Sequence, residues 1–219
     1  MADTLSDRPP VWIEARLDRE LGRWRWLVKW FLALPHLIVL GVLWIAVLVL
    51  TVIAGVSIVF TGRYPRGIFE FNLGVMRWTW RVIFYAFALG TDRYPPFSLQ
   101  DDPDYPARLD AVYPESLSRS LVWVKWWLLA IPHYLIVGLF LGGGPFKGGF
   151  FAGGLAGILA IIAGVTLALR RPYPESVFDF LMGMYRWAWR VVAYAALLRD
   201  EYPPFRLDNG PDEPPGQTS

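Results

Sequence analysis

The chain carries one ordered set of motifs twice, and this duplication limits the folds open to it. LALPH at 32–36 is matched by LAIPH at 129–133. RYPRGIFEFNLGVMRWTWRVIFYAFAL is matched by PYPESVFDFLMGMYRWAWRVVAYAALL, and TDRYPPFSL by RDEYPPFRL. Self-similarity in a fixed order indicates that one structural unit was duplicated. We therefore predict repeats at 11–100 and 107–208, a linker at 101–106, a flexible N-terminus at 1–10 and a disordered tail at 209–219.

The composition predicts a membrane protein. Hydrophobic residues make up 55% of the chain and charged residues 18%, against roughly a quarter charged in soluble domains. The 12 tryptophans are typical of a membrane–water boundary. The net charge of +2 argues against nucleic acid as a partner, so the expected partner is the lipid bilayer.

The motifs, taken together, resemble those of a family of uncharacterised bacterial membrane proteins known only as a domain of unknown function. The residues that carry the resemblance are AIPH, GRYPRGIFEF, the RW–RV–AY pattern and DRYPPFSL. The second repeat departs from the pattern because Pro172 precedes Tyr173, where Arg63 precedes Tyr64 in the first. The resemblance implies a helical membrane fold and implies no activity.

The apolar segments predict how each repeat meets the membrane. The first segment, 26–61, is much longer than the 20 or so residues that cross a bilayer. In the second repeat, segments 121–141 and 150–169 flank GGGPFKGG, a strong loop signal. We therefore predict an apolar helical hairpin in each repeat, the first with its turn near Gly41. The alternative for the first repeat is one long tilted helix kinked at Pro35.

The basic residues favour the hairpins. If both repeats are hairpins, every Lys and Arg except Lys147 lies on one side, as expected for cytoplasmic segments. This predicts a multi-pass protein of the bacterial cytoplasmic (inner) membrane with both termini in the cytoplasm. The alternating lead-ins at 11–15 and 107–111, and the extended PPFSL and PPFRL, predict a few short strands on that side.

A third helix in each repeat, at 67–89 and 176–198, carries a charged stripe. Glu70, Gly74, Arg77 and Arg81 are spaced four, three and four residues apart, which places them on one helix face. Two central arginines would cost about 5–7 kcal/mol against about 3–6 kcal/mol gained from apolar residues in the first of these helices. These amphipathic Arg/Trp-rich helices are thus predicted to lie at the interface or inside a bundle. The second repeat has the same stripe: Asp179, Gly183, Arg186, Arg190.

The stripes have two interpretations. In the favoured one, they lock the repeats together through Glu70–Arg186 and Asp179–Arg77 pairs, or they hold lipid phosphates. In the other, they line a solute or ion pathway, since charges within a membrane are often functional.

The RYP and PYP motifs are predicted to mark the aqueous boundary. Proline ends one helix and starts the next, arginine and tyrosine anchor the boundary, and the acid that follows favours the N-terminus of the next helix. The boundary residues are Arg63, Tyr64, Pro65, Tyr173 and Pro174.

The two histidines each follow a proline in an apolar segment, and these pairs are predicted to form helix kinks. Each histidine is expected to bond a carbonyl freed by the kink, with proton relay as the alternative. The pairs are Pro35 with His36 and Pro132 with His133.

No group of residues with a recognisable reaction chemistry is present. The chain has no cysteine and no Ser–His–acid set, metal-ligand cluster or dinucleotide fingerprint. We therefore expect no enzyme and no cofactor. The favoured hypothesis is a non-catalytic membrane scaffold, accessory subunit or bilayer-associated hairpin protein that contacts anionic headgroups. A homo-oligomer or a membrane-complex partner is compatible with it. The alternative is a small transporter or channel with the stripes lining a path between the repeats.

Overall fold

A computed structural model of the chain describes residues 11–142 and 154–208. The predicted flexible N-terminus, the predicted tail and most of the glycine-rich insertion lie outside these residues. The elements follow in this order: β1 (Val11–Ala15), α1 (Arg25–Thr61), α2 (Arg66–Ala86), β2 (Ala107–Ala111), a 3-10 turn (Leu121–Trp123), a π-helix (Lys125–Leu129), α3 (Ile131–Leu141), α4 (Gly154–Ala168), α5 (Glu175–Ala195).

The first apolar segment forms one uninterrupted helix, α1, so the predicted hairpin with a turn near Gly41 is wrong. α1 has 37 residues and contains Pro35. Gly41 lies within the helix, and no atom would come within 4 Å of a Cβ there. The chain around it holds no turn-forming residues, so nothing there offers the backbone an alternative to helix. The helix ends at Gly62, which adopts a φ of 72° and donates its N–H to the Ile58 carbonyl, an ending that glycine allows at little cost.

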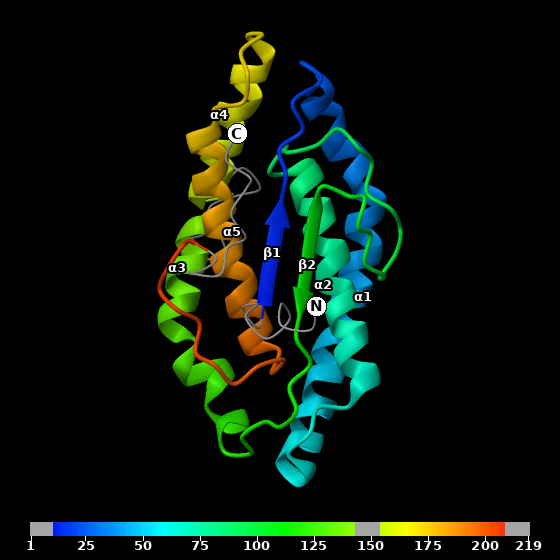
Figure 1. Cartoon of the computed structure of the whole chain (residues 1–219), viewed down its shortest axis with the longest axis vertical. Coiled ribbons are helices and arrows are strands. Elements are labelled where there is room, and N and C mark those ends of the chain that lie inside the picture. Colours follow the sequence, from blue (N-terminus) through cyan, green and yellow to red (C-terminus); the bar gives the residue numbers. More distant parts are fainter. Residues whose placement is uncertain (1–10, 143–153, 209–219) are drawn as a thin grey trace, which may run out of the picture.

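The second repeat builds the same rod from two helices, and these do not form an antiparallel hairpin either. Gly154, at the start of α4, lies so close to the end of α3 that an added Cβ would come within 2.5 Å of the Leu139 carbonyl oxygen. α4 then runs on in the direction of α3 (Figure 1). The loop prediction itself falls on 143–153, outside the described residues. We refer to α1 as the first rod, and to the π-helix, α3 and α4 together as the second rod.

A π-helix corrects the register of the second rod. VKWFLALPH in the first repeat corresponds to VKWWLLAIPH in the second, which has one extra residue between Lys125 and His133. The five-residue π-helix Lys125–Leu129 accommodates that residue, because a π-turn holds one more residue than an α-turn. As a result Lys125 and His133 keep the same spatial relation as Lys29 and His36.

The lead-in segments form the predicted strands. β1 and β2 pair antiparallel, with Ile13 opposite Leu109 at the centre of the register. One strand comes from each repeat, so the ribbon joins the two halves about an approximate two-fold axis (Figure 1). The YPPF segments, also expected to be extended, form no strand within the described residues.

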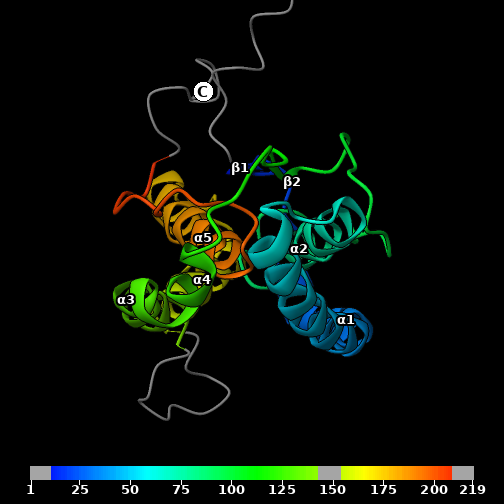
Figure 2. The same cartoon turned by 90° about the horizontal axis from the view of Figure 1, so that it is seen from below.

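The molecule has three layers (Figure 2). The two-stranded ribbon covers one face, α2 and α5 form the middle, and α1 and α3 lie on the opposite face. α2 and α5 contain most of the core, and Trp80 of α2 packs against Tyr185 of α5 with ring centroids 5.5 Å apart. Both helices end about three residues earlier than predicted, just before Leu89 and Leu197, which adopt left-handed φ angles of 56° and 62°.

Candidate functional site

His36 lies in a buried aromatic cluster that unites three of the repeated motifs. The indole Nε1–H of Trp78 donates to His36 Nδ1 at 3.0 Å. The Phe97 ring stacks on the imidazole with centroids 3.9 Å apart, and Tyr94 lies at 4.9 Å. Because Nδ1 accepts a hydrogen bond, the neutral ring carries its proton on Nε2. The partner of the histidine is thus an indole and not the carbonyl that we expected.

The second repeat has the same cluster. Trp187 Nε1–H donates to His133 Nδ1 at 3.0 Å, and Phe205 stacks on the ring with centroids 4.5 Å apart. Tyr202 takes the place of Tyr94 at 4.7 Å. The PH, RW and YPPF motifs therefore meet at one structural position, where they fasten each rod to the following amphipathic helix and to the segment after it.

A buried lysine–aspartate pair lies near the start of each rod, and sequence reasoning missed both. Lys29 Nζ lies 2.7 Å from Asp92 Oδ1 and 2.7 Å from the Thr91 carbonyl. Its ammonium group also faces the Tyr85 ring, 5.2 Å from the centroid. Only 3% of the Lys29 side chain and 10% of the Asp92 side chain are exposed, so each charge depends on the other for solvation.

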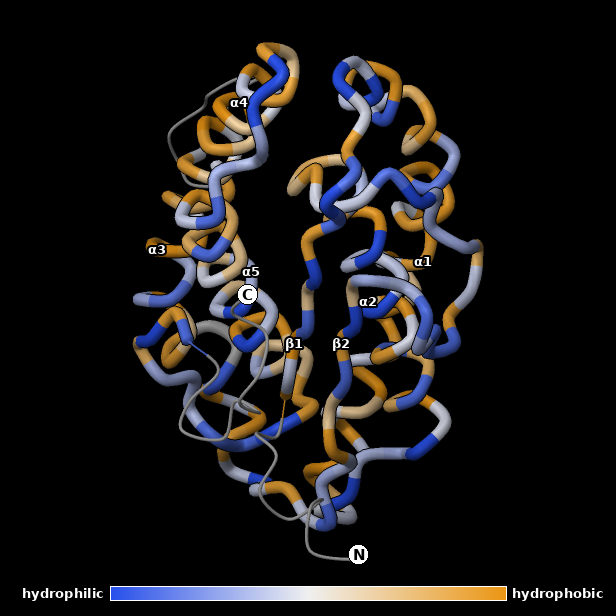
Figure 3. Tube along the Cα trace, turned by 45° about the horizontal axis from the view of Figure 1, so that its top comes forward, coloured by the Kyte–Doolittle hydropathy of each residue, from blue (hydrophilic) through white to orange (hydrophobic). Residues whose placement is uncertain are grey.

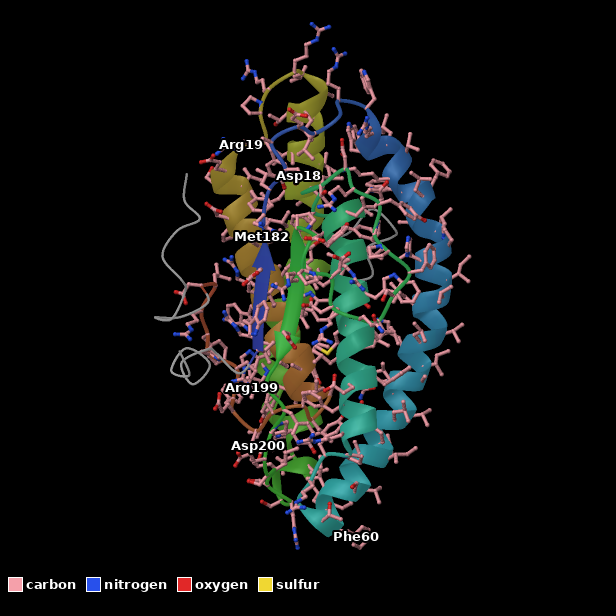
Figure 4. The ribbon with its side chains drawn as sticks, turned by 45° about the vertical axis from the view of Figure 1, so that its right-hand side comes forward. Asp18, Arg19, Phe60, Met182, Arg199 and Asp200 are labelled. Atoms are coloured by element: carbon pink, nitrogen blue, oxygen red, sulfur yellow. The ribbon has the colours of Figure 1, made fainter. Side chains whose placement is uncertain are left out.

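The equivalent pair in the second repeat is Lys125 with Asp200. Lys125 also donates to the Arg199 carbonyl at 2.7 Å and faces the Tyr194 ring at 5.1 Å. Figure 4 shows Arg199 and Asp200 near one end of the molecule, and Asp18 and Arg19 toward the other. The signal that could have found these pairs is the repeated VKW before PH together with the repeated D before YPPF.

The arginine stripe of α2 binds backbone carbonyls and one strand carboxylate. Arg77 donates to the Leu109 carbonyl at 3.2 Å and pairs with Asp110 at 2.6 Å, so it joins α2 to β2 of the other repeat. Arg81 donates to the carbonyls of Gln100, at 2.9 Å, and Ser98. Burial lowers the pKa of the Arg81 guanidinium.

The stripe of α5 follows a similar pattern. Arg190 donates to the carbonyls of Arg206, at 3.0 Å, and Asp208. Burial lowers the pKa of Arg190 to about 10, so the guanidinium is still charged at neutral pH. Arg186 is half-buried on α5, the helix that packs against β1.

The acidic residues of both stripes do not take part in these contacts. Glu70 and Asp179 are exposed, and Arg77 pairs with Asp110 instead of Asp179. Neither acid lies in the first turn of its helix, whereas Glu175 lies in the first turn of α5. The prediction that the acid after YP serves the helix N-terminus is therefore wrong for these two residues.

The glycines of the stripes allow a close approach of the chain. A Cβ on Gly74 would lie 2.8 Å from Leu99 Cβ, and a Cβ on Gly183 would lie 2.8 Å from Leu207 Cβ. Gly74 and Arg81 thus hold the segment after YPPF against α2, and Gly183 and Arg190 do the same on α5. The glycines and arginines of both stripes therefore stabilise the fold.

The boundary tyrosines bind the repeats to each other. Tyr64 donates to the Ala196 carbonyl at 3.2 Å, and Tyr173 donates to the Ala88 carbonyl at 3.1 Å. Burial raises the pKa of Tyr64 to about 12 and also raises that of Tyr173, so both hydroxyls stay protonated. Pro65 and Pro174 precede the first residues of α2 and α5, and Arg63 is exposed beside the end of α1.

The described surface has two shallow, charged depressions, of about 390 Å³ and about 520 Å³. The described residues include no group of three or more His, Asp or Glu side chains placed to bind a metal ion. The smaller depression lies near the start of α1, and its lining mixes both signs of charge: Asp18, Arg19, Glu20, Arg25, Asp92, Arg93.

A long apolar surface runs along both rods. α1 buries a narrow stripe that includes Ala33, Leu40 and Val47, and most of its other apolar side chains are exposed along its whole length. The second rod exposes Ile131, Leu135 and further residues in the same way. Figure 3 shows hydrophobic residues concentrated along both rods. Within the described residues, α1 is the one helix long and apolar enough to cross a membrane.

These features define a class: a duplicated, mainly helical protein in which a two-stranded ribbon and reciprocal tyrosines join two repeats beside a broad apolar face. The chain belongs to the family described as Domain of unknown function (DUF4389), whose model matches residues 23–98 and 150–206. The two matched segments fit the two repeats. No curated protein and no solved structure matches the chain.

Proposed function

We propose that the protein resides in a membrane, the bacterial cytoplasmic membrane, and serves there as a non-catalytic scaffold or accessory subunit. The observation that carries this proposal is the exposed apolar surface of the two rods. A line of α1 residues that includes Phe31, Val42 and Phe60 is 65–76% exposed. Monomeric soluble proteins rarely expose contiguous apolar patches above a few hundred Å², and this surface follows a helix about 55 Å long.

The polar groups support a scaffold more than a transporter. A transport path would present the stripe arginines to water or solute. Arg77, Arg81 and Arg190 instead bind backbone carbonyls, and Arg77 also binds Asp110. The two buried lysines likewise each bind an aspartate and a backbone carbonyl. The side chains that a partner can contact therefore lie on the exposed surfaces, which suits a role in binding lipids or another membrane subunit.

One amino-acid exchange made at two exposed sites tests the membrane proposal. Val42 on α1 is 65% exposed, and Val112, one residue after β2, is 55% exposed. We expect Val42→Asp to lower the vesicle partition coefficient, measured by flotation at limiting lipid, at least tenfold, because an aspartate costs about 2.5–3.5 kcal/mol in hydrocarbon. Val112→Asp, the matched control, should float like the parent chain. Equal flotation of both variants and the parent would contradict the proposal.

A further inference from the structure

The apolar residues of α1 face away from the rest of the protein along one line. Phe31, Val42 and Phe60 recur close to multiples of 3.6 residues, so they share a helix face. The buried residues Leu40 and Ile58 lie on the opposite face. Figure 4 shows Phe60 projecting from the end of α1, away from the body. This face of α1 has no protein partner within the described chain, and it continues over the length of the helix.

The length of α1 fits poorly with a single crossing. The apolar part between Leu27 and Phe60 is about 51 Å long, and the hydrocarbon core is about 30 Å thick. A crossing helix would have to tilt by over 50°, beyond the usual range of about 0–40°. The second rod is similar in length and packs against the middle layer in the same way (Figure 1).

The charged ribbon gives a stronger constraint. β1 and β2 lie at the middle of the long axis (Figure 1). Their side chains include Glu14, Arg108 and Asp110, and Arg108 pairs with Asp101 at 2.5 Å while keeping 26% of its side chain exposed. If the long axis crossed the bilayer, these groups would lie near its centre, where each charge costs about 2.5–3.5 kcal/mol. The ribbon therefore belongs in water, at the same level along the axis as the middle of α1.

Both conditions are met when the long axis lies parallel to the membrane. The ribbon and the rods are on opposite faces of the three layers (Figure 2), so one face can meet water while the other meets lipid. Exposed arginines stand at the ends of both rods, where they would reach headgroup phosphates: Arg25, Arg63, Arg119, Arg170. The exposed Trp24 and Trp123 lie near the starts of the rods, and tryptophan favours this depth.

We infer that both rods lie in the plane of the membrane, immersed in a single leaflet of anionic lipid, and that no helix of the described chain crosses the bilayer. This inference rests on the proposed membrane residence and replaces the multi-pass arrangement that the sequence predicted. All four rod ends then contact the same aqueous side. The anionic lipids of the cytoplasmic leaflet attract basic residues, which assigns this side to the cytoplasm, and the ribbon is presented there as a rigid polar surface.

Single cysteines at the rod ends test the inference, because the parent chain has no cysteine. Glu20→Cys lies before α1 and Arg63→Cys follows it, and both positions are exposed. We expect a membrane-impermeant maleimide to label both sites within twofold of each other in inverted membrane vesicles. Labelling in intact spheroplasts should be less than a tenth of that. Arg119→Cys and Arg170→Cys repeat the test on the second rod.

Each other outcome overturns the inference. Labelling of sites 20 and 63 from opposite sides would mean that α1 crosses the bilayer. This result is expected if oligomers of the chain cover the charged ribbon. Labelling from neither side would mean that the rod ends are buried. Flotation of the same samples tests the membrane proposal separately. If the parent chain does not float with the membranes, the proposed membrane residence is wrong. If the chain floats but the two sites are labelled from opposite sides, only the in-plane arrangement is wrong.

Discussion

Asp92→Ala should lower the free energy of unfolding by about 3–5 kcal/mol, because it leaves a buried lysine without its counter-charge. Lys29 Nζ is 2.7 Å from Asp92 Oδ1, and its side chain is 3% exposed. The same carboxylate accepts the Gly22 N–H at 2.6 Å, so the loss extends to the turn before α1. Thermal unfolding in one fixed detergent, followed by circular dichroism, measures the change. For a chain of this size the Tm should fall by roughly 6–20 °C.

Three further variants show whether charge is the cause. Asp104→Ala removes an exposed carboxylate and should leave the Tm unchanged. Asp200→Ala should cost less than Asp92→Ala, since 27% of the Asp200 side chain is exposed against 10% for Asp92. The double variant Lys29→Met/Asp92→Ala removes both charges and should recover more than half of the loss. A double variant no more stable than Asp92→Ala would refute the mutual solvation of the pair.

Removing one residue should be harmless in the second rod and severe in the first. Deleting Leu128 turns VKWWLLAIPH into VKWWLAIPH, which has the spacing of the first repeat. The π-helix should then become α-helix with Lys125 and His133 still in place, and the free energy of unfolding should change by less than about 1 kcal/mol. Deleting Phe31 instead turns Lys29 by about 100° relative to His36, and should cost about 3–5 kcal/mol through the broken pair with Asp92.

The two deletions control each other because both remove an exposed apolar side chain, 48% exposed for Leu128 and 74% for Phe31. The readouts are the Tm and a nitrogen–proton NMR correlation spectrum of a sample with isotope-labelled tryptophan. In that spectrum the indole Nε1–H signals of Trp78 and Trp187 report the two histidine contacts. Loss of the Trp187 signal on deletion of Leu128, with the Trp78 signal kept on deletion of Phe31, would contradict the assigned register.

The sequence was sufficient for the duplication, the strand pairing and the amphipathic helices, since each depends on local pattern. The strands at 11–15 and 107–111 were predicted from alternation alone and are confirmed. The hairpin prediction was wrong for the first repeat because the loop signal GGGPFKGG occurs only in the second repeat. In the second repeat, α4 begins against the end of α3 and continues in the same direction (Figure 1).

The partners of the polar groups could not be predicted, because they depend on tertiary geometry. The stripe spacing correctly placed Arg77 and Arg81 on one face, but spacing does not reveal that strand and loop carbonyls lie opposite that face. The histidine contacts are also tertiary: Pro35 favoured a freed carbonyl as the partner of His36, whereas the actual donor is Trp78, 42 residues away. The reciprocal contacts of Tyr64 and Tyr173 likewise exist only once the repeats are assembled.

Sedimentation velocity of the purified chain in buffer without detergent tests the central claim, that lipid covers the apolar face of both rods. A chain that exposes residues such as Phe31 and Phe60 at 74% and 76% should aggregate within the experiment, and should become monodisperse when detergent micelles or lipid nanodiscs are supplied. A monodisperse species at the monomer mass of 25.0 kDa in plain buffer would contradict the account.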